Sequence, residues 1–383
     1  MSRLLVFLML YFCIYGTAHL YLLIKWRRAF YLEGVEYFLL FMILAFMFLA
    51  PINARMLESQ GHWLAALVMN WVGFLWMGFV FIFICLALPL DGYHLLVSAG
   101  QRLAGADWTG LMFSRRQSVV ITAIVTCGLM IYGAVEAHRI RTETVTIRSS
   151  RLPPAAGRIR IVQISDIHLG PMLYPGRLAP MIEAIEQARP DMLVCTGDLI
   201  DGPVLRSEAV AAEFRDIPAP LGKFAVTGNH EYYYGIERAA AFIKEAGFKL
   251  LSDQRISVGA HTVVTGINDL ADGHGDRDDK AEKELSDGLP GDKFRLLLKH
   301  RPVYNPETQG RYDLQLSGHT HNGQIFPFGL LVRLFYPLGC GMHQVAPESG
   351  LYSSPGTGTW GPPIRILAPP EITVFDIVPN TKQ

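Results

Sequence analysis

The sequence predicts an N-terminal region of four transmembrane helices followed by a soluble α/β domain. Half of the 383 residues are hydrophobic and the mean hydropathy is positive (+0.25), which is high for a soluble protein. The long apolar runs all lie within residues 1–140. After a linker at 141–157, short apolar segments alternate with amphipathic ones, the pattern of strands and helices in an α/β fold.

The apolar residues of the first region form four runs, at about 4–24, 35–54, 63–90 and 118–136. Each is near or above the roughly 20 residues that cross a hydrocarbon core of about 30 Å. Each must be helical in lipid, because backbone polar groups cannot be left unpaired there. Arg3 and the apolar residues after it resemble a signal peptide, but the long first run and the three later runs favour an uncleaved helix.

The distribution of basic residues, the net charge and two isolated polar residues bear on the orientation of the protein in the membrane and on its partners. The loops opposite the termini carry slightly more basic residues than the terminus side, which predicts loops inside and the soluble domain outside. The net charge of zero gives no reason to expect nucleic acid as a partner. His19 and Asn70 lie alone inside predicted spans, where hydrogen bonding between helices is favoured over an ion pathway.

The predicted soluble domain covers residues 158–378. Apolar runs predict strands at 158–165, 191–196 and 223–227, and periodic patterns predict helices at 177–189 and Glu237–Ala246. The charged segment 272–287 is interpreted as a solvated loop and helix.

Polar side chains follow these three strands and two further strand-like apolar segments, 296–299 and 314–317, at the point where each ends. In an α/β sheet, ligands bind beyond the carboxyl ends of the strands, so these side chains are expected to converge. A single Asp or His at the end of a strand is more often a cap or a turn former than a metal ligand. Together they form a much stronger signal, and the candidates are Asp166, His168, Asp198, Asn229, His300, His319 and His321.

Imidazole, carboxylate and amide oxygen are ligands that suit divalent Mn, Fe, Zn or Mg. Because no thiolate is among the candidates, a closed structural zinc site is disfavoured. Seven residues are too many for one ion, whereas two metal ions that share a carboxylate account for them. Gly197, Gly228 and Gly318 each precede a candidate, where the lack of a Cβ permits a sharp turn and a close approach.

These residues resemble the signature of the calcineurin-like metallophosphoesterases, over about residues 158–378. The motifs are Asp166-x-His168, Gly197-Asp198, Gly228-Asn229-His230-Glu231, His300 and Gly318-His319-x-His321. The segments Gly356-Thr-Gly and Pro363-Ile-Arg-Ile are similar to the ending of a bacterial, membrane-anchored phosphohydrolase branch. Glu231 stands where many members have Asp.

The resemblance implies a sandwich of two β-sheets flanked by helices, and a hydrolase in which metal-activated water cleaves a phosphoester or diphosphate. Asp198 would bridge the two metal ions, and His230 would stabilise or protonate the leaving oxygen without binding metal. The first ion would be held by Asp166, His168 and His321, and the second by Asn229, His300 and His319.

The four spans and the resemblance suggest a lipid-linked substrate at a bacterial inner membrane, such as the UDP-2,3-diacylglucosamine of lipid A synthesis. A nucleotide or phosphoprotein phosphodiesterase is one alternative, and a non-catalytic metal-binding sensor or scaffold is another. Tyr232, Tyr233 and Tyr234 either line a substrate rim or pack in a cluster. Residues 324–340, unusually apolar for a loop, either dock on membrane or acyl chains or pack in the core.

Overall fold

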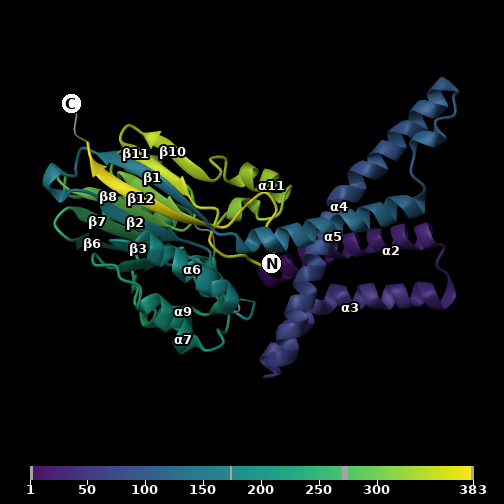
Figure 1. Ribbon diagram of the computed structural model, residues 1–383, viewed down its shortest axis with the longest axis horizontal. Coiled ribbons are helices and arrows are strands. Elements are labelled where there is room, and N and C mark those ends of the chain that lie inside the picture. The colour runs from purple at the N-terminus through teal and green to yellow at the C-terminus, as the bar shows by residue number, and fades with distance from the viewer. Residues whose placement is uncertain (1–2, 173–174, 270–274, 381–383) are drawn as a thin grey trace. The chain divides into compact units, whose positions relative to one another are not determined.

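The structure, a computed structural model, describes residues 3–172, 175–269 and 275–380. The chain divides into two compact units. The first consists of Met1–Gly133 with Gly361–Pro363, and the second of Ala134–Trp360 with Ile364–Gln383. Figure 1 labels many of their helices and strands.

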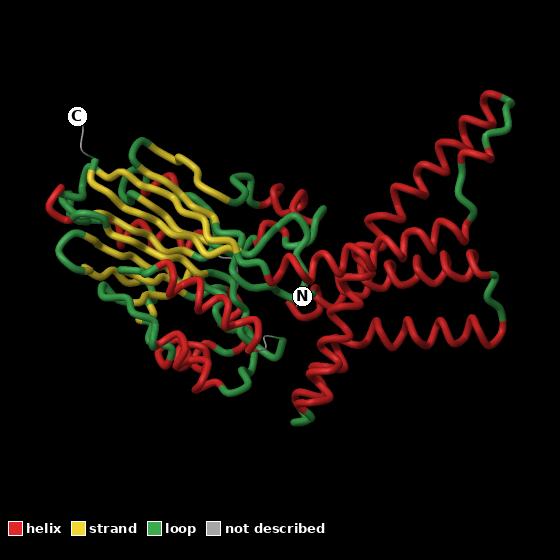
Figure 2. The backbone as a smooth tube through the Cα atoms, in the orientation of Figure 1, coloured by secondary structure: helices red, strands yellow, loops and turns green. Residues whose placement is uncertain are grey.

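The first unit is helical, as expected for segments in lipid (Figure 2). All four predicted spans are helical, and within the described residues three helical segments are long and apolar enough to cross a membrane. The first predicted span is divided by a π-helical turn at Tyr11–Tyr15, so its α-helical pieces are individually short. The helices are α1 (Arg3–Leu10), α2 (Gly16–Phe30), α3 (Gly34–Ser59), α4 (Trp63–Ala104) and α5 (Arg115–His138).

His19 confirms the prediction of hydrogen bonding between helices. Its side chain is buried in α2, where Nδ1 lies 2.8 Å from the carbonyl oxygen of Tyr15. Trp76 of α4 donates a hydrogen bond from Nε1 to Nε2 of the same ring, at 2.9 Å. The bond from Trp76 therefore links α2 to α4, while Nδ1 is satisfied within its own helical segment.

The second unit confirms the predicted two-sheet sandwich. The first sheet has the order β1-β12-β2-β3-β4-β5 and the second the order β10-β11-β9-β8-β7-β6. The strands of the first are β1 (Arg141–Ser149), β2 (Ile159–Ile164), β3 (Met192–Thr196), β4 (Lys223–Val226), β5 (Lys249–Leu250) and β12 (Glu371–Pro379). Those of the second are β6 (Gln254–Val258), β7 (Thr262–Ile267), β8 (Phe294–Lys299), β9 (Leu314–Ser317), β10 (Gly341–Ala346) and β11 (Ser349–Ser353).

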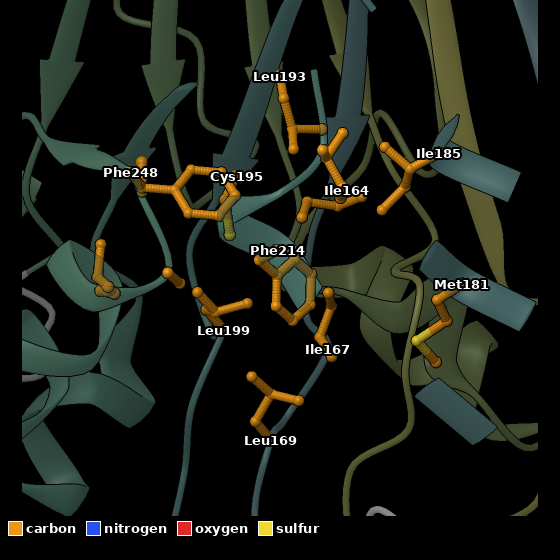
Figure 3. Packing of buried hydrophobic residues seen from close by; sticks show 14 of the residues in the cluster. Ile164, Ile167, Leu169, Met181, Ile185, Leu193, Cys195, Leu199, Phe214 and Phe248 are labelled. Atoms are coloured by element: carbon orange, nitrogen blue, oxygen red, sulfur yellow. The ribbon is translucent and has the colours of Figure 1, made fainter. Parts of the chain in front are cut away.

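Apolar side chains fill three layers of this unit. Between the sheets, Val194 and Phe375 of the first sheet pack with Leu296 and Leu316 of the second. The outer face of the first sheet packs against α6 (Pro175–Ala188), α7 (Ser207–Arg215) and α9 (Ile236–Glu245), and Figure 3 shows part of this cluster. Residues of α10 (Gly275–Ser286) pack beside Ile267 and Leu297 on the outer side of the second sheet.

The segment predicted as a linker, 141–157, is partly a strand, so this part of the prediction is wrong. Residues Arg141–Ser149 form β1, which pairs in parallel with Glu371–Pro379. The alternation of Val145 and Ile147 with threonines turns both apolar side chains towards the core between the sheets. The sandwich therefore begins before residue 158.

The other predicted strands and helices of the soluble part are present within a few residues of their expected ends. β2, β3 and β4 match the three predicted strands, and α6 and α9 match the two predicted helices. The charged helix predicted within 272–287 is α10, while the loop part at 272–274 lies outside the described residues. The second unit also contains α8 (Asn229–Tyr234) and α11 (Phe328–Phe335).

Candidate metal centre

All seven predicted metal ligands lie just beyond the carboxyl ends of strands from both sheets. β2, β3 and β4 run parallel in the first sheet, and β8 and β9 run parallel in the second. Their ends therefore meet at one edge of the sandwich, as the sequence predicts. Gln163 of β2 ties this edge together, because its amide donates to Thr196 of β3 and to the carbonyl oxygen of Ser317 in β9.

The structure brings six of these side chains, together with His230, into three overlapping groups that could hold metal ions. In each group, one ligand atom per residue lies within 4.8 Å of the others. Asp198 belongs to two of the three groups, which is the position expected of a bridging carboxylate. The groups are Asp166, His168 and His321; His168, Asp198 and His230; and Asp198, His300 and His319.

Two pairs of imidazole nitrogens face each other. Nε2 of His168 lies 3.0 Å from Nε2 of His321, and Nε2 of His300 lies 3.1 Å from Nδ1 of His319. Oδ2 of Asp198 lies between these pairs, 3.2 Å from Nε2 of His300 and 3.9 Å from Nε2 of His168. The arrangement defines two neighbouring positions on either side of one carboxylate.

The donor set fits two divalent cations. Asn229 is buried at the start of α8, and its Oδ1 has no hydrogen-bond partner within the described residues. A buried amide oxygen without a partner is costly, and a cation beside it would remove that cost. Facing imidazole nitrogens likewise suit a cation between them, because each neutral ring offers a lone pair.

The candidate ligands are held by neighbours that aim their metal-facing atoms. Nδ1 of His168 lies 3.2 Å from Oδ2 of Asp201, and Nδ1 of His300 lies 2.7 Å from the carbonyl oxygen of Thr196. With protons on these Nδ1 atoms, Nε2 of each ring is free to bind metal, the usual arrangement around ligating histidines. The backbone N–H of His319 donates to both oxygens of Asp166, at 3.0 Å.

Backbone strain is concentrated at this edge. A non-glycine residue with positive φ is uncommon, and such residues cluster at functional sites. Five of the seven candidate ligands have φ between 48° and 72°: Asp166, His168, Asp198, His319 and His321.

The structure confirms that glycines are needed for the close approach of the backbone to the candidate ligands. A Cβ on Gly228 would collide with the carboxylate of Asp198, and one on Gly318 would collide with Ser165 and Asp166. Both positions therefore need a residue without a side chain, so that the backbone can approach the carboxylates closely.

Asp198 and His300 form a buried ion pair. Burial alone would raise the pKa of Asp198, but the attraction of His300 outweighs burial, and the pKa lies well below its ordinary value. Burial would lower the pKa of His300, whereas Asp198 raises it, to about 10. The carboxylate at the shared position is therefore ionised at neutral pH, and a metal ion bound at Nε2 of His300 would displace the proton of this pair.

His230 lies at the rim of the centre, on α8. Its ring centroid is 4.6 Å from that of His168, 5.2 Å from that of Tyr233 and 5.7 Å from that of Trp360. Burial, followed by repulsion from His168, lowers the pKa of His230 to about 4. Its Nδ1 is 3.9 Å from Oδ2 of Asp201, so this carboxylate lies near both histidines.

Two of the three predicted rim tyrosines, Tyr233 and Tyr234, support different interpretations. Tyr233 is exposed and lies beside His230, so it lines the rim together with Trp360. Tyr234 is only partly exposed and packs against the core cluster beneath the helices. Gln324 fixes Trp360 by hydrogen bonds to its backbone N–H and carbonyl, each at 2.8 Å.

Three residues around the centre were not predicted in the roles that the structure gives them. Asp201 follows Asp198 by three residues and contacts His168. Glu231 is fully buried and accepts backbone hydrogen bonds from the loop that carries Asp198. Arg365 is also fully buried behind His321 and donates to the carbonyl oxygens of residues 356, 358 and 368. For Arg365, the only signal in the sequence was the Pro363-Ile-Arg-Ile segment.

Comparison with known proteins identifies the class to which this fold and centre belong. The family model of the calcineurin-like phosphoesterases matches residues 159–323. An uncharacterized metallophosphoesterase of Aquifex aeolicus is 36% identical over 249 residues, covering 64% of this chain and 95% of the relative. The uncharacterized metallophosphoesterase YkuE of Bacillus subtilis is 35% identical, covering 63% of this chain and 87% of the relative.

A transmembrane protein with a metallophosphoesterase domain from Danio rerio is 32% identical over 356 residues. This match covers 86% of the present chain and 79% of the relative, so it extends beyond the sandwich into the N-terminal helices. The chain therefore belongs to the calcineurin-like phosphoesterases, a family that hydrolyses phosphoesters with divalent metal ions. Its apolar helices and this relative indicate association with a membrane.

Proposed function

We propose that the protein is a membrane-anchored phosphohydrolase with two divalent metal ions at the strand ends. The observation that carries the proposal is the position of Asp198, an ionised carboxylate within 4 Å of histidines from both ligand groups. Asp166, His168 and His321 would hold one ion, and Asn229, His300 and His319 the other. Mn, Fe, Zn and Mg all suit these ligands.

When bound, the two ions would activate water and neutralise charge on the phosphoryl oxygens. Side chains of the protein orient the metal ligands and contact the substrate. Asp201 keeps His168 in the required orientation, and Glu231 holds the loop of Asp198. His230, at the rim between Tyr233 and Trp360, would face the phosphate and donate a hydrogen bond or proton to the leaving oxygen.

Replacing His230 with alanine tests the division of roles. We expect kcat for bis-p-nitrophenyl phosphate to fall at least about a hundredfold, the usual contribution of a general acid or base. The metal content, measured by inductively coupled plasma mass spectrometry, should remain close to that of the unchanged protein. Loss of both metals in His230→Ala would instead make His230 a ligand and refute its proposed role.

For the substrate, we propose a lipid-linked phosphoester or diphosphate, because membrane helices precede the hydrolase domain in the same chain. UDP-2,3-diacylglucosamine is one compound of this class. A nucleotide or phosphoprotein would not require anchoring beside a bilayer. A non-catalytic metal-binding sensor or scaffold would not require His230 at the rim.

We also propose a multi-pass topology in a bacterial inner membrane, with the catalytic domain on the outer side. The slight excess of basic residues in the loops opposite the termini supports this orientation. Digestion of intact spheroplasts with a protease should then remove the catalytic domain. A domain that is cleaved only after the cells are lysed would lie on the inner side.

A further inference from the structure

We propose that α11 and its flanking residues dock on the surface of a lipid bilayer, immediately beside the metal centre. We call residues 326–338 the α11 surface. It follows the turn of His319 and His321 in the chain and precedes β10. Neither the proposed ligands nor His230 belong to it.

The α11 surface is apolar and exposed, so this part of residues 324–340 does not pack in the core, although Gln324 and Ile325 before it are buried. Apart from Gly329 and Arg333, every residue of α11 is apolar, and none of its eight residues, all described, is buried. Leu334 is 74% exposed and Phe335 is 80% exposed. Phe326, Leu330, Leu331 and Leu338 extend the same exposed patch.

Such a helix needs a partner. A helix of eight residues is marginal by itself in water. Gly329 and Arg333, four residues apart, share one face of α11 and leave the remaining surface apolar, which is the pattern of a helix that lies in a membrane interface. Contiguous apolar patches of this kind are uncommon on soluble monomers and mark interaction sites.

Two observations favour a bilayer as that partner. The same chain carries helices long and apolar enough to span a membrane, which keeps the domain at high local concentration beside the lipid. From Asn322 to Gln344 the chain contains Arg333 but no acidic residue, so the segment suits an anionic lipid surface. Because α11 is much shorter than the roughly 20 residues of a span, it would lie in the interface.

The α11 surface is joined to the metal centre by direct contacts. The ring of Tyr336, at the end of α11, lies 5.3 Å from the ring of His319. The backbone of Gly329 lies so close to Gly323 that a Cβ on Gly323 would collide with it. Docking of α11 would therefore place the metal centre at the level of the lipid headgroups. The class of substrate that follows, a phosphoester at the bilayer surface, rests on the proposed function.

A photo-crosslinking experiment tests the docking without relying on catalysis. The full chain, with benzoylphenylalanine in place of Leu334, is reconstituted into vesicles of phosphatidylcholine and phosphatidylglycerol and irradiated. We expect phospholipid adducts at position 334, and none when the same group replaces Leu205, which is 68% exposed in the segment between β3 and α7. Adducts at 334 only with a second copy of the protein, or with residues 1–133, would overturn the proposal.

A kinetic experiment tests the consequence for substrate delivery. Phosphatidyl-p-nitrophenol in the same vesicles is compared with water-soluble bis-p-nitrophenyl phosphate. In both, water adds to phosphorus as the bond to p-nitrophenolate breaks. In Leu334→Glu, we expect about tenfold slower hydrolysis of the lipid, because burial of a leucine is replaced by a charge, with unchanged hydrolysis of the soluble ester.

The matched Leu205→Glu variant should hydrolyse both substrates at the rate of the unchanged protein. Equal rates of lipid hydrolysis in Leu334→Glu and the unchanged protein would overturn delivery by the α11 surface. If the unchanged protein cleaves neither ester, the proposed function fails, and the lipid adduct at position 334 alone decides whether α11 docks.

Discussion

Replacing Asp198 with asparagine is expected to abolish metal-dependent hydrolysis. The carboxylate lies between the two ligand groups, 3.2 Å from Nε2 of His300 and 3.9 Å from Nε2 of His168. A neutral amide cannot balance two cations, so both should bind weakly. Without them, the pKa of water returns from about 7 towards 15.7, and we expect kcat/KM for bis-p-nitrophenyl phosphate to fall at least about ten-thousandfold.

The control for this variant is Asp216→Asn, which removes an exposed carboxylate at the end of α7. It should retain full activity and metal content. Circular dichroism of Asp198→Asn should match that of the unchanged protein, which separates loss of metal from loss of fold. A folded Asp198→Asn protein that keeps two metals and full activity would show that this carboxylate does not bridge them.

The second large effect is expected on stability, from Glu231→Gln. Oε1 accepts backbone hydrogen bonds from Leu199 and Ile200, at 2.7 and 3.2 Å, and Oε2 accepts from Asp198 and Gly228, at 3.1 and 2.7 Å. In the glutamine variant, an NH₂ group replaces one of these carboxylate oxygens and faces two backbone N–H donors, from which it cannot accept. Two buried N–H groups then lose their acceptor, which should lower the free energy of unfolding by roughly 2–6 kcal/mol.

Urea unfolding in detergent, followed through the catalytic domain, measures this change. Glu237→Gln, at an exposed position of α9, is the matched control and should change stability by less than about 0.5 kcal/mol. A Glu231→Gln protein as stable as this control would mean that Glu231 does not hold the Asp198 loop.

The gathering of the seven candidate ligands could be predicted because their positions follow from strand direction. Parallel strands end at a common edge, so Asp198 after β3 and His300 after β8 had to lie near that edge. The glycines before Asp198, Asn229 and His319 marked close approaches that any side chain would block. Their roles as ligands remain proposals.

The supporting contacts could not be predicted, since they depend on how loops fold rather than on strand order. Asp201 reaches His168 because of the local path of the loop after β3. Arg365 binds carbonyl oxygens of its own loop, which have no signature in the sequence. β1 was mistaken for a linker because it lies at the edge of its sheet, beside a strand near the other end of the chain.

The most direct test of the proposed function is a metal titration of the purified full-length protein. The protein is first stripped with a chelator, and Mn²⁺ is then added while hydrolysis of bis-p-nitrophenyl phosphate is followed. We predict no cleavage without metal and a rate that saturates at two equivalents of bound Mn²⁺ per chain. The absence of cleavage with Mn²⁺, Fe²⁺, Zn²⁺ or Mg²⁺, or full activity with one bound ion, would contradict a two-metal phosphohydrolase.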